Sequence, residues 1–152
     1  PTPFLINGGI EMLRSFIKDI DEEAVTHNAE ILKTQFAAEI NFLRNARHYY
    51  QYGKLLITHA GFDSTAENWQ DTSNQDFLWI REHYLQPNQT GLINIFGHTP
   101  TRNMHKIDDI WISPCQSYIG IDGGCAYGGQ LNALLISEQG EILETFVEHS
   151  DK

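Results

Sequence analysis

Two short apolar segments of this sequence each run into a histidine that is followed by small or turn-forming residues. The segments read ITHAG over residues 57–61 and FGHTP over residues 96–100, which places His59 and His98 at the ends of two expected strands. In open α/β sheets, ligands bind just beyond the carboxyl ends of the strands. Neutral imidazole nitrogens from neighbouring strands can bind one metal ion together. The repeated pattern favours a shared metal site over the alternative, in which each histidine is only a turn residue bonded to nearby backbone.

Three further residues are candidates for a site, and each also has a structural interpretation. Arg81 lies in an expected helix, where an arginine is more often a solvated surface charge. Asp122 ends an expected strand, and at such a position turn chemistry takes precedence over catalysis. Tyr127 lies on the loop after Asp122, between the glycine pairs at 123–124 and 128–129. These glycines fit tight turns better than a phosphate-binding loop, because they do not open a helix.

The remaining reactive residue types are interpreted as structural. Trp79 is expected in the core, and Cys115 and Cys125 are expected to be inert packing residues. No G-x-S-x-G sequence is present, so a Ser-His-Asp hydrolase has little support. The histidines that do not follow a strand are expected at the surface: His27, His48, His83, His105 and His149.

The elements that would position these side chains follow from hydrophobic spacing. Residues 9–20 show helical spacing, and a second helix follows with Asp21 or Asn28 as its cap. The apolar stripe of this second helix consists of Leu32, Phe36, Ile40 and Leu43. Strands that begin at Lys54 and Leu92 run into the two histidines, with a helix over residues 76–85 between them. Further strands are expected over residues 110–113, 118–121, 131–137 and 141–147. A helical first third and a mostly β last third predict an α/β fold with a mixed sheet.

Length and composition restrict the class of protein further. The chain has 152 residues, the length of one domain, and a net charge of −10. An acidic chain disfavours nucleic acids and anionic membranes as partners, because their phosphates are neutralised by Lys and Arg. No apolar run approaches the roughly 18 residues that a membrane span needs. The two cysteines form no C-x-x-C pair. We expect a cytoplasmic protein with no nucleic-acid or membrane partner.

Five segments of the chain occur in an order that is typical of one family of enzymes. They are FLRNARHYY at 42–50, HAGF at 59–62, FLWIRE at 77–82, GHTP at 97–100 and IDGGCAYGGQL at 121–131. Together they resemble bacterial PPP-type serine/threonine protein phosphatases of the calcineurin-like metallophosphoesterase family, over nearly the whole chain. The resemblance implies the C-terminal part of the layered α/β/β/α sandwich of that family, with mixed sheets and with a helix over residues 42–50.

The resemblance also implies a chemistry and the roles of particular residues. Two divalent metal ions, manganese first and iron or zinc as alternatives, would clamp a phosphoryl group and activate water. His59 and His98 would be ligands of one ion, and Arg81 would hold phosphate oxygens. Tyr127 and Asp122 would lie on the substrate side. The implied reaction is hydrolysis of phosphomonoesters, in phosphoserine or phosphothreonine of proteins or in small phosphoesters. A symmetrical dinucleoside tetraphosphate hydrolase is the alternative enzyme.

Three other motifs of that family are not found in these 152 residues, namely G-D-x-H-G, G-D-x-x-D-R-G and G-N-H-E. They would supply the remaining metal ligands, a second phosphate-binding arginine and a proton-donating histidine. We therefore expect a single domain that is incomplete on its N-terminal side. Such a chain would expose an apolar sheet edge and favour a homo-oligomer. A catalytically incomplete chain that self-associates is the non-enzymatic alternative.

Overall fold

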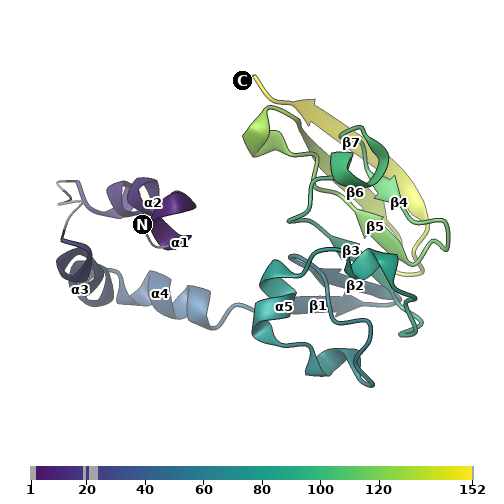
Figure 1. Ribbon diagram of the computed structural model, residues 1–152, viewed down its shortest axis with the longest axis horizontal. Helices are drawn as coiled ribbons and strands as arrows, with labels where there is room; N and C mark the ends of the chain where they lie inside the picture. Colours follow the sequence, from purple (N-terminus) through teal and green to yellow (C-terminus); the bar gives the residue numbers. More distant parts are fainter. Residues whose placement is uncertain (1–2, 19, 21–23, 152) are drawn as a thin grey trace. The chain divides into compact units, whose positions relative to one another are not determined.

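The computed structural model describes residues 3–18, 20 and 24–151, and the chain forms two compact units, residues 1–46 and 47–152 (Figure 1). The first unit is helical, and the second unit contains the strands. No helix of the described residues is long and apolar enough to cross a membrane. The helices of the first unit are α1 (Pro3–Ile6), α2 (Gly9–Phe16), α3 (Val25–Gln35) and α4 (Ala37–Arg44).

The helices of the first unit differ from the prediction at their boundaries. α2 ends at Phe16, four residues short of the predicted end. The second predicted helix is interrupted at Phe36, which ends α3 and precedes α4. Asn28 was predicted as a cap, but Ala24 takes that position, and Asn28 lies buried inside α3. The alternative cap, Asp21, lies outside the described residues.

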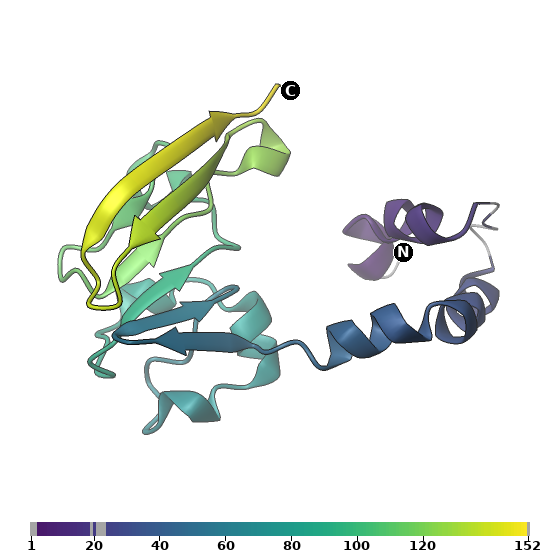
Figure 2. The same ribbon diagram turned by 180° about the vertical axis from the view of Figure 1, so that it is seen from behind.

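The second unit is a mixed α/β structure, as the sequence predicts. A five-stranded sheet in the order β1-β2-β3-β5-β4 has three parallel central strands and an antiparallel strand at each edge, and a β6–β7 hairpin forms a second sheet (Figures 1 and 2). The strands are β1 (Tyr49–Tyr52), β2 (Leu55–Thr58), β3 (Ile93–Phe96), β4 (Trp111–Ile112), β5 (Tyr118–Gly120), β6 (Gln130–Ile136) and β7 (Ile142–His149). The helical segments are η1 (Trp69–Asp71), α5 (Asn74–Trp79), η2 (His83–Leu85), α6 (Arg102–His105) and η3 (Cys125–Tyr127).

Both faces of the central strands are covered, because successive residues of a strand point to opposite faces. The face toward α5 buries one cluster: Leu56, Phe62, Phe77, Phe96 and Tyr118. The opposite face packs against the β6–β7 hairpin through a second cluster: Leu55, Ile95 and Ile119 with Leu134, Ile136 and Ile142. Strands buried on two sides read as continuous apolar runs rather than alternating ones. The LLI and INIF runs of the sequence therefore follow from this layering.

The segment that was predicted as a helix over residues 42–50 is helical only in its first part. α4 ends at Arg44, and β1 begins at Tyr49. Gly53, with a φ of 55°, lies in the two-residue turn that pairs Tyr52 with Leu55. This tight turn matches the twist of the two strands. Pairing with β2 therefore decides the conformation of residues 49–52, and that pairing is not visible in the local sequence.

The helix predicted over residues 76–85 is shorter and begins earlier. The Ser73 Oγ accepts a hydrogen bond from the Asp76 N–H at 3.0 Å, which is a favourable N-cap for α5. α5 ends at Trp79, and Glu82 adopts a left-handed backbone with a φ of 61°. A non-glycine residue in this conformation does not continue a right-handed helix, so the chain resumes only as the 3₁₀ turn η2. The short helix α6 was not predicted.

Two predictions of core packing are wrong. Trp79 is 51% exposed, because Phe77 takes the side of α5 that faces the sheet. Cys115 is also exposed and does not pack in a core, whereas Cys125 is half-buried. The hydroxyl groups of Ser113 and Ser117 hydrogen-bond to the Cys115 sulfur and lower the pKa of its thiol to about 7. Cys115 is therefore a solvated thiol rather than an inert packing residue.

Candidate functional site

The parallel pairing of β2 and β3 brings the two strand-end histidines together. The register pairs Leu55 with Ile93 and Ile57 with Ile95, so both strands end at the same edge of the sheet. The rings of His59 and His98 follow directly, with their centroids 5.2 Å apart. The Gly97 N–H donates a hydrogen bond to the His59 carbonyl at 2.8 Å, which ties the two turns to each other.

His98 occupies an unusual backbone conformation inside this edge. Its φ of 64° lies in the left-handed region, which non-glycine residues rarely adopt outside functional sites and turns. The Trp79 and His98 rings meet edge to face, with centroids 5.4 Å apart, and among the described residues the buried His98 Nε2 has no hydrogen-bond partner. Burial lowers the pKa of His98, and the nearby Arg81 and His59 lower it further. The side chain is therefore a neutral imidazole at neutral pH, which is the form that binds metals.

Arg81 lies beside the histidine pair. The Arg81 Nη1 is 3.5 Å from the His98 carbonyl oxygen, a long contact that leaves most of the guanidinium donors available. The side chain is exposed, and among the described residues no carboxylate forms an ion pair with it. A guanidinium beside His98 with no carboxylate partner among the described residues suits an anion with bidentate oxygens, such as a phosphate.

Asp122 and Tyr127 occupy different surroundings. Asp122 follows β5, the third parallel strand, and its Oδ1 accepts a hydrogen bond from the Gly124 N–H at 2.8 Å. The prediction that Asp122 stabilises a turn is therefore confirmed. The Asp122 charge also acts on His98, whose pKa it raises slightly against the dominant effect of burial. Tyr127 is 82% exposed on η3, and in the described part of the chain no hydrogen bond or ring contact joins it to His59 or His98. Its role near a substrate stays a prediction.

His83 was predicted at the surface, and this is wrong, because the side chain is only 4% exposed. The Asn94 amide nitrogen donates to the Leu56 carbonyl and to the Thr58 hydroxyl, both at 3.0 Å. Its Oδ1 is therefore the acceptor for the His83 Nε2, also at 3.0 Å, which fixes the proton on that nitrogen. Burial lowers the pKa of His83 to about 4, and the bond to Asn94 offsets a small part of this effect. An asparagine inside the apolar run LINIF was the signal for a buried polar partner.

The other histidines predicted at the surface are only partly so. His27 and His149 are exposed, whereas His48 and His105 are half-buried. The His48 ring stacks on Phe77 with centroids 6.0 Å apart. The His105 Nε2 lies 2.9 Å from the Asp109 carbonyl oxygen and therefore has a local backbone partner.

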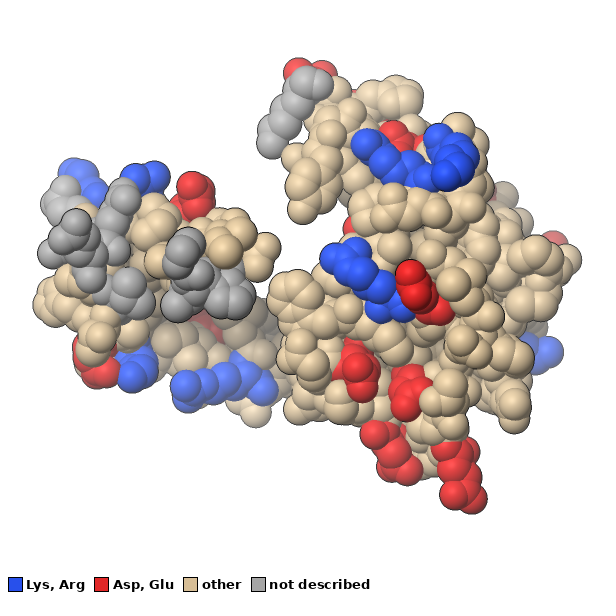
Figure 3. Space-filling model, viewed as in Figure 1, with Lys and Arg blue, Asp and Glu red and all other residues tan. Residues whose placement is uncertain are grey.

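Charge is distributed unevenly over the second unit. Figure 3 shows acidic side chains gathered over the segment that contains η1, whereas basic side chains stand in separate places on the same face. With a net charge of −10, the molecule as a whole repels anions. An anionic ligand would therefore depend on local donors such as Arg81 rather than on the overall field.

The histidine pair fits part of a metal site. Two imidazoles at one sheet edge, one of them with an unpartnered buried nitrogen, suit shared coordination of a divalent ion. Catalytic metal sites commonly take three protein ligands. Within the residues that the structure describes, no group of three His, Cys, Asp or Glu side chains is placed to hold an ion. At such a site His59 and His98 would supply two ligands, and further ligands would be needed.

Comparison of the chain with models of protein families, with curated proteins and with solved structures gives no match.

Proposed function

We propose that this chain forms part of a metal-dependent phosphomonoesterase. The observation that carries the proposal is the meeting of His59 and His98 at the carboxyl edge of β2 and β3, with Arg81 beside His98. Imidazoles that can bind a metal ion, next to a guanidinium that can bind an anion, suit phosphoryl transfer. The five ordered segments that resemble serine/threonine protein phosphatases support the same reaction, with phosphoserine or phosphothreonine as the favoured substrates.

The layering of the second unit is compatible with the metallophosphoesterase sandwich. α5 covers one face of the mixed sheet, and the β6–β7 hairpin covers the other. This gives the order helix, sheet, sheet within residues 47–152. The positions of His59 and His98 beyond parallel strand ends agree with the general placement of sites in open α/β sheets.

Each proposed residue has one task. His59 and His98 would hold one divalent ion through neutral imidazole nitrogens, and bound metal would supply Lewis-acid stabilisation and an activated water. Arg81 would bind and orient the phosphate oxygens, which is a positioning role for a planar donor. Trp79 meets His98 edge to face, and this contact would limit the movement of the imidazole ring. Asp122 would act on His98 through its charge while it holds its own turn.

The test is manganese-dependent hydrolysis of p-nitrophenyl phosphate by the intact chain, beside His98→Ala and His149→Ala. His149 is exposed at the end of β7, so its replacement controls for the loss of a histidine. We expect His98→Ala to lower kcat/KM at least 100-fold, because loss of a ligand weakens metal binding, and His149→Ala to stay near wild type. Equilibrium dialysis with Mn²⁺ would give a second readout, with weaker binding in His98→Ala alone.

Two outcomes contradict the proposal in different ways. A wild-type rate in His98→Ala would remove the histidine pair from the site. The second outcome is that the chain shows no turnover and that its binding of Mn²⁺ does not depend on His98. This result would contradict the enzymatic function and favour the non-enzymatic alternative, a chain that self-associates.

A further inference from the structure

The start of β1 lies at the same sheet edge as the histidine pair. β1 runs antiparallel to β2, and its register pairs Tyr49 with Thr58. The residues just before β1, Arg47 and His48, therefore lie beside the turn that begins at His59. Continued past Tyr49, the register sets His48 opposite His59 and Arg47 opposite Ala60, and Arg47 and His59 line the same hollow.

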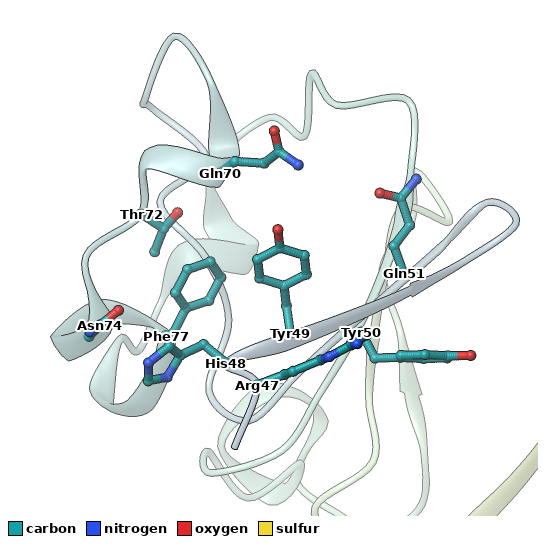
Figure 4. Close-up of a pocket in the computed structure, with 9 residues that line it drawn as sticks. All are labelled: Arg47, His48, Tyr49, Tyr50, Gln51, Gln70, Thr72, Asn74 and Phe77. Atoms are coloured by element: carbon teal, nitrogen blue, oxygen red, sulfur yellow. The ribbon is translucent and has the colours of Figure 1, made fainter. Parts of the chain in front are cut away.

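Two hollows lie along β1 and share the residues Arg47–Tyr50. The hollow that includes His59 has a volume of about 440 Å³ and is also lined by Arg47–Tyr50 and Ile57. A second hollow of about 530 Å³ shares Arg47–Tyr50 and continues past Gln51 toward Gln70 and Phe77. Figure 4 shows the Tyr49 ring between the Phe77 and Gln51 side chains, with its hydroxyl toward Gln70. We call these two hollows together the β1 groove, which is lined by residues from His59 through Arg47–Gln51 to Gln70.

β1 offers backbone groups to the β1 groove. Within the described residues, β1 pairs only with β2, so its other edge is open. The turn makes Tyr52 and Leu55 a directly bonded pair, and bonding alternates along an antiparallel ladder. The N–H and C=O groups of Gln51 and Tyr49 therefore point away from β2. An open strand edge of this kind accepts an extended peptide as an additional strand.

The side chains that line the β1 groove determine which peptide side chains it can bind. Arg47 is exposed, and in the described part of the chain no carboxylate forms an ion pair with it. Its guanidinium can receive an acidic side chain. Tyr50 and Ile57 are 53% and 39% exposed and give the end near His59 an apolar wall. The groove therefore combines one free cation with apolar surface beside the candidate site.

The rings of the β1 groove favour a peptide over a nucleotide. Tyr49 meets Trp69 edge-on with centroids 4.9 Å apart, and it also contacts Phe77 at 5.6 Å. His48 stacks on Phe77 at 6.0 Å. These four rings are already packed against one another, so they are not open to sandwich a base. The backbone edge, by contrast, is open over successive residues.

We propose that the β1 groove binds an extended phosphorylated polypeptide that carries an acidic residue within two positions of its phosphoserine or phosphothreonine. This inference rests on the proposed function, which accounts for the phosphoryl end at His59 and His98. A strand rises about 3.3 Å per residue. An acidic side chain one or two residues from the phosphoryl group therefore reaches Arg47. Arg47 is a specificity-determining residue in this arrangement, not a catalytic one.

The experiment uses fluorescein-labelled peptides with a non-hydrolysable phosphonate in place of the phosphate, bound to the intact chain with Mn²⁺ and followed by anisotropy. The peptides carry glutamate two positions before the phosphonate, two positions after it, or alanine at both places. We expect one glutamate peptide to bind the wild-type chain roughly five- to tenfold more tightly than the alanine peptide. Arg47→Gln should reduce this ratio to near one. Arg44→Gln, in an exposed arginine at the end of α4, is the matched control and should preserve it.

A second variant tests the open backbone edge. Gln51→Pro removes an outward N–H, at an edge position where proline is tolerated. We expect all the peptides to bind roughly threefold to tenfold more weakly to Gln51→Pro, with the preference for glutamate unchanged. A peptide affinity that does not change would overturn the added-strand geometry. Circular dichroism checks that the variant folds, and Arg47→Gln tests the groove even where Gln51→Pro does not fold.

The outcomes separate this inference from the proposed function. Hydrolysis of p-nitrophenyl phosphate with no glutamate preference, or with a preference that Arg47→Gln retains, would overturn the β1 groove and leave the phosphatase. A glutamate preference that depends on Arg47 without any hydrolysis would support the groove and contradict the phosphatase. ADP could also bind more tightly than the glutamate peptides and lose its binding in Arg47→Gln. That result would overturn the proposed peptide ligand and indicate a nucleotide.

Discussion

A chain of buried polar groups supports the backbone that presents His59. His83 lies against Gly61, where a Cβ would collide with the imidazole ring, and it is hydrogen-bonded to Asn94 of β3. Asn94 in turn holds the Leu56 carbonyl and the Thr58 hydroxyl in β2. Asn94 is hydrogen-bonded through both its oxygen and its nitrogen, whereas the buried Nδ1 of His83 has no hydrogen-bond partner among the described residues. An unpaired buried polar group is costly, and a proton added to this nitrogen would also have no acceptor. The network therefore couples the protonation of one histidine to the stability of the sheet edge.

The stability of the second unit should depend on pH through His83. Burial lowers the pKa of the folded side chain to about 4, whereas an unfolded histidine has its ordinary value near 6.5. Between these two values the unfolded chain binds a proton that the folded chain does not. The stabilisation is fully present above pH 6.5 and is lost as the pH falls toward 4. The shift corresponds to about 3 kcal/mol over that window.

Urea unfolding of wild type, His83→Gln and His149→Gln between pH 4 and 7 measures this effect. Glutamine can still donate to Asn94, and it does not titrate. We expect the midpoint of His83→Gln to fall less steeply with decreasing pH than that of wild type, whereas His149→Gln follows wild type. Parallel curves for wild type and His83→Gln would show that other groups cause the acid sensitivity.

At the scale of elements, the β1–β2 turn fixes the register that brings Arg47 beside His59. Gly53 has a φ of 55°, and a Cβ there would collide with the Glu138 carbonyl of the β6–β7 turn. Gly91 has a similar φ of 71° but has open space around it. Gly53→Ala should therefore combine backbone strain with a steric collision, whereas Gly91→Ala has the strain alone.

We expect Gly91→Ala to lower the free energy of unfolding by about 1 kcal/mol and Gly53→Ala by roughly 1–3 kcal/mol more. Chemical denaturation of the two variants beside wild type gives the comparison. Equal losses would mean that the Glu138 turn moves away without cost, and that contact between the two turns does not fix the hairpin.

Local sequence predicts the elements whose own residues decide their conformation. Strands β2 and β3 were predicted because burial on two faces leaves an apolar run, and the following histidines then fell at one edge. β1 was not predicted, because Tyr49–Tyr52 becomes a strand only through pairing with β2. His83 was misplaced for a similar reason, since its partner Asn94 lies eleven residues away on another element. Long-range partners therefore account for these two errors.

At the scale of the whole molecule, the two units differ in how much core they contain. Both apolar clusters of the second unit use side chains from residue 49 onward. Among the described residues of the first unit, Leu13 is the one buried large apolar side chain. Hydrophobic burial is the main favourable term in folding, and short chains bury too little of it. The second unit is therefore the part with the means to fold independently.

A fragment of residues 47–152 should fold without the first unit. We expect a cooperative thermal transition with a midpoint within about 5 °C of the main transition of the intact chain. If removal of the first unit lowers the free energy of unfolding by less than roughly 1 kcal/mol, the midpoint of a domain of this size changes by no more than about 5 °C. The fragment of residues 1–46 should show no cooperative transition. Well-dispersed amide NMR signals would identify the folded fragment.

Exposed apolar side chains on the hairpin, Leu131, Leu135 and Phe146, favour association at high concentration, so sedimentation is measured over a range of concentrations. If the fragment of residues 47–152 is unfolded at low concentration, the two apolar clusters of the second unit are not stable without the first unit.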